Sequence, residues 1–126
     1  MEIITVSQLY EFFLQTLNHC GMYLLKSDIE DIEYSLFEEF DTDSISFLHS
    51  NSLNRLLDHQ YISAEVYSMS QLLYEKFRKM ENTNLWNAYC VKTSPEWLEI
   101  LSLSDKIKSG LREPVGQGTV LCLDSE

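Results

Sequence analysis

The sequence predicts an all-α fold, a single-domain bundle of about five helices, with room for a short two-stranded edge formed by the termini. The length of 126 residues suits one domain. Apolar residues make up 44% of the chain, which is enough for an ordinary core. The apolar residues recur at helical spacing after residues that favour helix starts. The chain has only four glycines and two prolines, so few residues interrupt this pattern.

The first two helices follow from caps and apolar stripes. Ser7 is placed to cap a helix over residues 8–20, and Gly21 to end it in a left-handed turn. Ser27 and Glu30 match a capping box ahead of a helix that reaches about residue 40. The inward stripe of this second helix contains Ile29, Ile32, Leu36, Phe37 and Phe40.

The remaining helices are marked as clearly. A helical pattern starts near Ser44, includes Ile45 among its apolar residues, and is divided by the polar residues 49–52. Ser63 caps the longest pattern, residues 64–80, and residues 81–93 are expected to form a loop with buried anchors. Ser94, Pro95 and Glu96 begin the last helix, which Gly110 closes. Its predicted inward residues are Trp97, Leu98, Leu101 and Ile107.

The composition changes after this helix. Residues 111–126 contain two of the four glycines and one of the two prolines. We therefore expect a helical domain over residues 1–110 and a linker-like tail over 111–126, within which "TVLCL" favours a short strand.

The charge is strongly negative and unevenly placed. The formal net charge is −11, and nearly all of the excess lies in residues 1–65. Residues 27–43 alone hold eight carboxylates and no Lys or Arg. Such a field repels phosphate, which argues against direct binding of nucleic acid or of an anionic membrane surface. It favours association with a basic partner.

The three cysteines, Cys20, Cys90 and Cys122, are far apart and form no CxxC pair, which is typical of reduced thiols. The N-terminus lacks the basic and apolar segments of a secretory signal, and no stretch approaches transmembrane length. The expected location is therefore the cytoplasm.

No motif in the sequence predicts a catalytic residue, a bound cofactor or a metal ion. "DTDSIS" begins like a calcium loop, but Ile45 and Ser46 stand at the fifth and sixth positions, where coordination fails. The histidines share no short spacing, and no phosphate-binding or hydrolase motif is present. Cys20 follows His19 directly but is better interpreted as a core thiol. The prediction is a protein that is not an enzyme and needs no cofactor.

A protein interface on the second helix remains as the candidate site. Tyr34 projects among carboxylates there, and an exposed aromatic residue within charged neighbours is typical of interfaces. The carboxylates at the expected C-terminal end of this helix also oppose its dipole, which suggests a purpose other than stability. A solvated helix face is the competing interpretation. The predicted partner-binding residues are Asp31, Tyr34, Glu38, Glu39, Asp41 and Asp43.

Several segments together resemble the small helical immunity proteins of bacterial contact-dependent growth inhibition and related polymorphic toxin systems. The segments are "SQLYEFFLQTL", "DIEYSLFEEFD", "ISFLHSNSLNRLL", "LWN" and "TSPEWLEILSLSDKIKSGL". The resemblance covers roughly residues 7–111 and implies a cytosolic antidote that binds one cognate toxin domain. Such toxins are often basic nucleases, many of which attack tRNA. The resemblance assigns no binding residue, because these families diverge at the interface.

Other functions stay open from the sequence alone. An acidic regulator or DNA mimic would block a nucleic-acid-binding protein of the host. An enzyme would need an ordered metal or a deep polar pocket, and an assembly module would need neither. The oligomeric state is not specified by the sequence.

Overall fold

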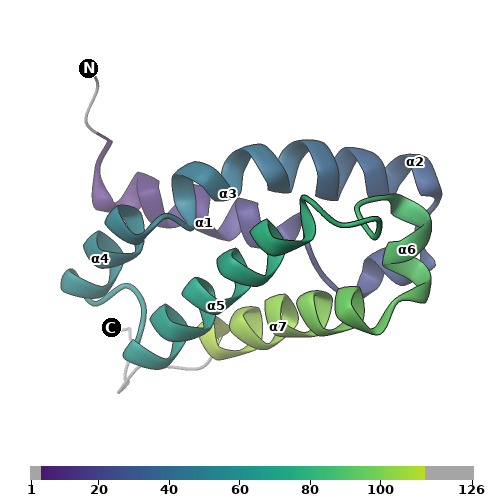
Figure 1. The fold of residues 1–126 in the computed structure, drawn as a ribbon. Helices are drawn as coiled ribbons and strands as arrows, with labels where there is room; N and C mark the ends of the chain where they lie inside the picture. The colour runs from purple at the N-terminus through teal and green to yellow at the C-terminus, as the bar shows by residue number, and fades with distance from the viewer. Residues whose placement is uncertain (1–3, 113–126) are drawn as a thin grey trace.

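The computed structural model describes residues 4–112, and every regular element among them is helical (Figure 1). The all-α prediction is confirmed. The predicted edge of the terminal strands and the tail after Arg112 lie outside the described residues. The elements are α1 (Val6–Asn18), the 3-10 helix η1 (Met22–Lys26), α2 (Ile29–Ile32), the π-helical η2 (Glu33–Phe40), α3 (Asp41–Phe47), α4 (Ser50–Asp58), α5 (Ala64–Met80), α6 (Ala88–Thr93) and α7 (Pro95–Arg112).

Elements α2, η2 and α3 form one uninterrupted helix, called the rod below, over residues 29–47. The backbone keeps right-handed helical angles at both junctions, with φ −60° and ψ −44° at Glu33 and φ −57° and ψ −50° at Asp41. The sequence predicted two helices here, separated near residues 41–43. That prediction is wrong, because the chain turns only after Phe47, at Leu48 and His49.

The π-helical stretch affects how the buried residues of the rod line up. The fully buried positions of the rod and the residue after it are spaced at four: Ile32, Leu36, Phe40, Ser44 and Leu48. In an α-helix four residues rotate by about 400°, so such a row would drift by about 40° at each step. A π-turn is wider, since each N–H bonds five residues back, and rotates less per residue. The η2 segment therefore offsets the drift and keeps the buried row straight.

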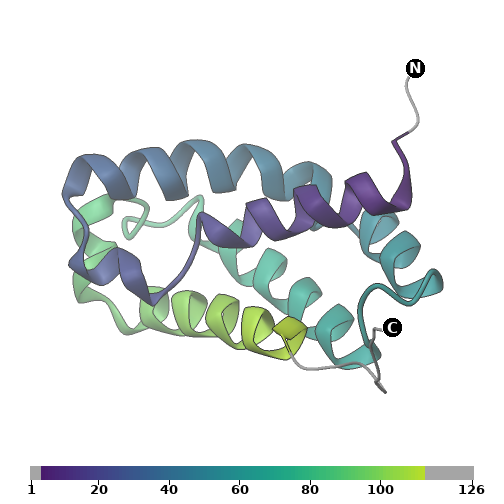
Figure 2. The same cartoon turned by 180° about the vertical axis from the view of Figure 1, so that it is seen from behind.

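The helices form two layers. The rod and α1 make one layer, and α5 and α7, which pack against each other, make the second (Figures 1 and 2). Helix α4 contacts both α1 and α5 at one end, while α6 and η1 contact each other and α7 at the other end. None of the helices in residues 4–112 combines the length and hydropathy needed to cross a bilayer.

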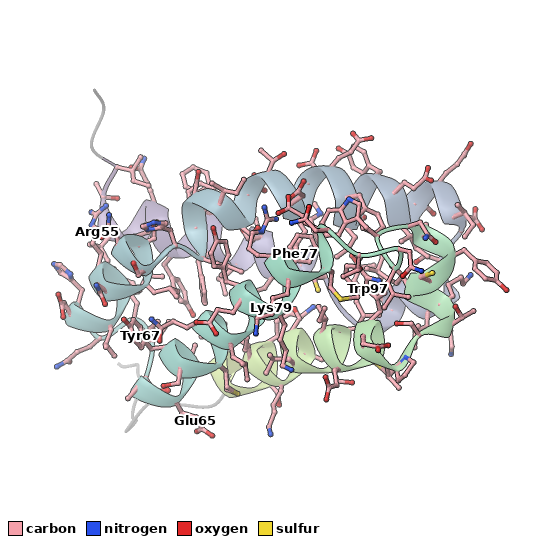
Figure 3. The ribbon with its side chains drawn as sticks, viewed as in Figure 1. Arg55, Glu65, Tyr67, Phe77, Lys79 and Trp97 are labelled. Atoms are coloured by element: carbon pink, nitrogen blue, oxygen red, sulfur yellow. The ribbon has the colours of Figure 1, made fainter. Side chains whose placement is uncertain are left out.

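An aromatic cluster fills the space between the layers at the α6 end. Trp97 is fully buried, as predicted, and its indole N–H donates to the carbonyl of Leu85 at 2.7 Å. Figure 3 shows Phe77 and Trp97 turned into the interior. Phe77 meets Phe40 edge-on at a centroid distance of 4.8 Å, and half-buried Trp86 meets Phe77 at 5.1 Å. These contacts attach the rod to the second layer.

Two predicted caps are confirmed and two are wrong. Ser63 and Ser94 accept from the backbone N–H groups of Val66 and Trp97, as expected for the starts of α5 and α7. Thr5, rather than Ser7, caps α1, in a capping box with Gln8. The box expected at Ser27 is absent from this part of the structure, because the Ser27 hydroxyl instead donates to the carbonyl of Tyr23.

Three predicted boundaries also shift. Helix α1 ends at Asn18, and Gly21 is extended, with φ 171°, rather than left-handed. The predicted loop over residues 81–93 contains the short helix α6, which Asn87 caps. Helix α7 passes Gly110 and runs to Arg112.

Candidate acidic interface

The spacing of four divides the rod into rows, and one row faces solvent along its whole length. This solvent row contains Glu30, Tyr34, Glu38, Thr42 and Ser46, none of which is fully buried. Tyr34 retains 55% of its accessible surface and has Glu38 one turn further along the same row. Two of the six predicted site residues therefore lie side by side on the outermost ridge of the rod.

A second row flanks the solvent row on the side of α1. Its predicted site residues are Asp31, which is exposed, and Glu39 and Asp43, which are half-buried. At the end of this row Phe47 stacks on Phe12 of α1, with ring centroids 5.1 Å apart. Packing against α1 therefore limits how far Glu39 and Asp43 project into solvent.

Asp41 occupies the opposite flank and faces the second layer. Its carboxylate forms an ion pair with the guanidinium of Arg78 on α5, and Arg78 also pairs with Glu81 at 3.3 Å. The predicted site residues are thus divided among three rows, and Asp41 already has a partner within the protein. The sequence does not show this pairing because Asp41 and Arg78 are 37 positions apart.

The electrostatics of the rod are dominated by carboxylates without basic neighbours. The rod itself contains no Lys or Arg. Among the described residues, Asp31, Glu38, Glu39 and Asp43 form no ion pair. Glu39, as a hydrogen-bond acceptor and as a nearby charge, raises the pKa of the Tyr34 hydroxyl. Burial, followed by the charge of Glu39, raises the pKa of Asp43.

The carboxylates predicted to oppose the dipole at the C-terminal end of the second helix do not lie at a helix end. Glu38, Glu39, Asp41 and Asp43 lie within the rod rather than at its C-terminal end, because the helix continues to Phe47. Their charges therefore do not meet the exposed carbonyls of a helix terminus, where dipole effects are concentrated. The unusual feature is that Glu38, Glu39 and Asp43 form no ion pair with a base among the described residues.

A shallow hollow of about 320 Å³ lies beside the solvent row, where the rod meets the segment before α6. Glu33 and Glu38 provide carboxylates, and Phe37 and Trp86 provide aromatic surface, with ring centroids 4.8 Å apart. Asn87 and Ala88 complete its lining. Carboxylates beside aromatic rings suit a guanidinium or an ammonium group, which gains from both ion pairing and cation–π contact. Glu33 was not among the site residues predicted from the sequence.

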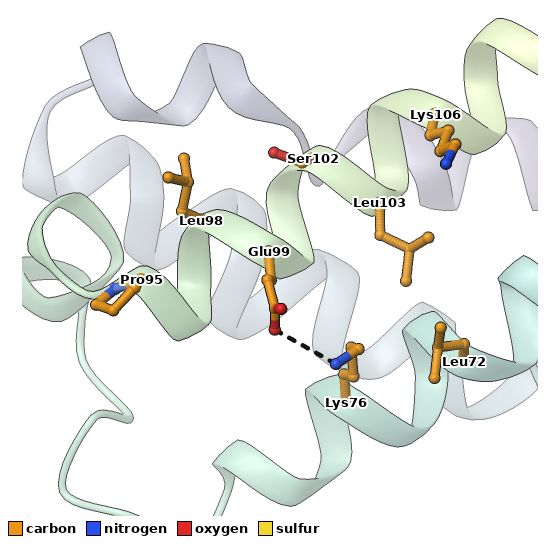
Figure 4. Close-up of a pocket in the computed structure, with 8 residues that line it drawn as sticks. All are labelled: Leu72, Lys76, Pro95, Leu98, Glu99, Ser102, Leu103 and Lys106. Carbon is orange, nitrogen blue, oxygen red and sulfur yellow. Dashed lines mark hydrogen bonds and ion pairs between the residues drawn. The ribbon is translucent and has the colours of Figure 1, made fainter.

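A larger groove of about 530 Å³ lies between α5 and α7, away from all predicted site residues (Figure 4). Its apolar lining includes Leu72, Pro95 and Leu103, and Lys76 at its edge pairs with Glu99 at 3.4 Å. Leu98 also lines this groove and is 42% exposed, so its predicted inward position is wrong.

The predictions for His19 and Cys20 have separate outcomes. Cys20 is fully buried, which confirms a core thiol, and burial raises its pKa to about 12. His19 is half-buried at the end of α1 and faces the rod. One donor atom each from His19, Glu39 and Asp43 lie within 4.8 Å of one another. The separation of these residues in the sequence concealed this cluster.

Comparison with known proteins adds no family to this description. No protein-family model, curated protein or solved structure significantly matches the chain.

Proposed function

We propose that the protein is an immunity protein that binds and neutralises a cognate toxin domain, a basic nuclease acting on RNA. The observation that carries this proposal is the hollow beside the solvent row. The hollow places Glu33 and Glu38 next to the aromatic rings of Phe37 and Trp86. The rod that carries both carboxylates contains no Lys or Arg. This surface suits an arginine or lysine side chain of a partner.

The chemistry of a nuclease explains why such a surface would inhibit it. A nuclease presents Lys, Arg or His where the phosphate of its substrate binds. Carboxylates on a helix can occupy the same positions and attract the same side chains. The row of buried residues fixes the rod to the bundle, so its carboxylates need little ordering on binding. Long-range attraction would accelerate encounter, and Tyr34 would contribute contact area.

Growth rescue combined with co-purification tests the function. The toxin domain encoded immediately upstream of this gene is expressed with and without the protein. Rescue with a one-to-one complex that weakens at high salt is expected. Rescue without a stable complex would indicate an enzyme that reverses the damage. The absence of both rescue and a complex would refute the proposal. Capture of several host DNA-binding proteins would favour a DNA mimic.

Paired variants test the surface. Glu33→Gln with Glu38→Gln should weaken toxin binding at least tenfold, because a desolvated cation would lose both of its counter-charges. Glu65→Gln with Glu75→Gln removes the same charge from α5, outside the rod, and should leave affinity within twofold. Equal losses in the two pairs would show that only net charge matters. Asp41 is kept unchanged, because its replacement would remove one of the two carboxylates that pair with Arg78.

A further inference from the structure

The cluster of His19, Glu39 and Asp43 joins two elements that lie far apart in the sequence. His19 is the C-cap of α1, whereas Glu39 and Asp43 belong to the rod. All three residues are half-buried, and the three donor atoms lie within 4.8 Å of one another. Imidazole nitrogen and carboxylate oxygen are both ordinary metal ligands.

The fold itself holds this arrangement in place. Glu39 and Asp43 are four residues apart on the flank row and so lie one above the other on the same side of the rod. The stacking of Phe12 on Phe47 holds α1 against this side of the rod. The Thr16 hydroxyl donates to the carbonyl of Phe12, and the backbone N–H of His19 bonds the carbonyls of Leu17 and Thr16. The end of α1, and with it His19, is thereby positioned beside the two carboxylates.

The charges of the cluster are uncompensated within the described residues. Across residues 4–112, no Lys or Arg side chain pairs with Glu39 or Asp43, and His19 forms no ion pair with either. Two carboxylates spaced at four on a helix repel each other. A bound cation would remove this repulsion.

We propose that His19, Glu39 and Asp43 bind one Zn²⁺ ion. One nitrogen and two carboxylate oxygens form a three-ligand set that leaves a fourth position for water. Donors in a tetrahedral zinc site lie about 3.4 Å apart, so rotation of the side chains must close the present separations. The imidazole nitrogen favours zinc over Mg²⁺ and Ca²⁺, which prefer oxygen ligands.

Binding would have two consequences for the molecule. The ion would connect the end of α1 to the middle of the rod and stabilise the layer they form, because a ligand specific for the folded state adds to its stability. The ion would also neutralise the carboxylates of Glu39 and Asp43, which lie on the row beside Tyr34 and Glu38. The proposal does not depend on the proposed function, and its test needs no toxin.

Calorimetric titration with Zn²⁺, supported by thermal unfolding, provides the test. Thiols also bind zinc, so all variants carry Cys90→Ser and Cys122→Ser. We expect one ion per chain, and His19→Ala and Asp43→Asn should each weaken binding at least tenfold. Free Zn²⁺ at one hundred times Kd should raise Tm by roughly 10 °C. Equal concentrations of Mg²⁺ should leave Tm unchanged.

Matched controls separate this site from general binding of cations by an acidic protein. His59→Ala removes an exposed histidine at the end of α4. Glu38→Gln removes a carboxylate that is next to Glu39 in the sequence but lies on the solvent row. Both should keep zinc affinity within twofold. The proposal is overturned if zinc does not bind, if His19→Ala binds as tightly as its parent, or if the controls lose as much affinity as the ligand variants. Circular dichroism of each variant checks that the helices remain.

Discussion

Among the single residues, Cys20 shows how burial changes the response of the fold to pH. Burial raises the pKa of this thiol to about 12, against an ordinary value of 9.0. Between these values the unfolded chain has lost the proton that the folded protein keeps. The unfolding free energy should therefore fall by up to about 1.4 kcal/mol per pH unit from this group. Below pH 9 the contribution is constant.

Urea unfolding at several pH values from 8 to 10.5 measures this effect. Cys20→Ala removes the group and should show a shallower decrease above pH 9 than the wild-type protein. The absolute stability of the variant will be lower at every pH, because the substitution leaves a small cavity. If the unfolding free energies of the two proteins fell in parallel with pH, the prediction would be contradicted. The slope with pH reports the titration of the thiol, whereas a constant difference reports only the cavity.

Gly21 is required for space rather than for backbone freedom. A Cβ atom at this position would lie 2.6 Å from Oδ1 of Asp105 and 2.9 Å from Nζ of Lys108. Both side chains are engaged: Asp105 accepts from the N–H of Met22 at 3.1 Å, and Lys108 donates to the carbonyl of Cys20 at 2.9 Å. Gly21→Ala must displace them, and we expect a loss of about 1–3 kcal/mol in unfolding free energy.

Gly110 provides the matched control for this measurement. It lies inside α7, and a Cβ atom added there would have Cγ2 of Val66 as its nearest neighbour, at 3.4 Å. Gly110→Ala gains helix propensity and should stabilise the protein by up to about 1 kcal/mol. Urea denaturation of the two variants should therefore give effects of opposite sign. A neutral Gly21→Ala would show that Asp105 and Lys108 can move without cost.

At the scale of elements, the rows of the rod predict how much the truncation of an isoleucine costs at each position. Ile32 is fully buried, whereas Ile45 is 51% exposed. Ile32→Ala should cost about 2–5 kcal/mol, as for other buried aliphatic residues. Ile45→Ala should cost less than about 1 kcal/mol. Chemical denaturation of this pair compares the same substitution at two points of one helix, and similar losses would contradict the described packing.

Local signals predicted the helices well, and tertiary contacts explain what they missed. Ser63, Ser94 and Pro95 act within one turn of the chain, so their helix starts were found. Ile29, at 42% exposure, was placed inward because the expected stripe assumed regular α-helical rotation. The π-helical turns alter this rotation, and they carry the contact of Phe40 with Phe77 of α5, which is 37 positions away in the sequence.

The candidate site was predictable to a similar extent. The sequence identified the acidic segment and the exposed position of Tyr34, because both follow from composition and helical spacing. It did not separate Asp41, which Arg78 of α5 neutralises, from Glu38, which pairs with no base in the described chain. The sequence also did not predict that His19 lies beside Glu39 and Asp43 of the rod. Each of these depends on a contact between distant segments.

At the scale of the whole molecule, we expect the distribution of charge to make the stability of the protein depend on salt. Among residues 4–112, the side chains of Arg55, Arg78, Lys92 and Lys108 hydrogen-bond to backbone carbonyls or to Asp41, away from the solvent row. The carboxylates of the rod therefore repel one another with little compensation. The same field would attract a basic partner.

Salt should consequently stabilise the free protein. Raising NaCl from about 10 mM to about 150 mM shortens the screening length from about 30 Å to about 8 Å, which weakens repulsion along the rod. We expect Tm to rise by a few degrees, on the order of 1 kcal/mol. Glu33→Gln with Glu38→Gln should reduce this salt dependence more than Glu65→Gln with Glu75→Gln, because α5 contains Lys76, Arg78 and Lys79 within four residues of Glu75, whereas the rod contains no base. Calorimetric scans at the two salt concentrations make the comparison. A Tm that is constant or falls with salt would show that repulsion among the rod carboxylates does not limit stability, and would weaken the case for a strong local field at the interface.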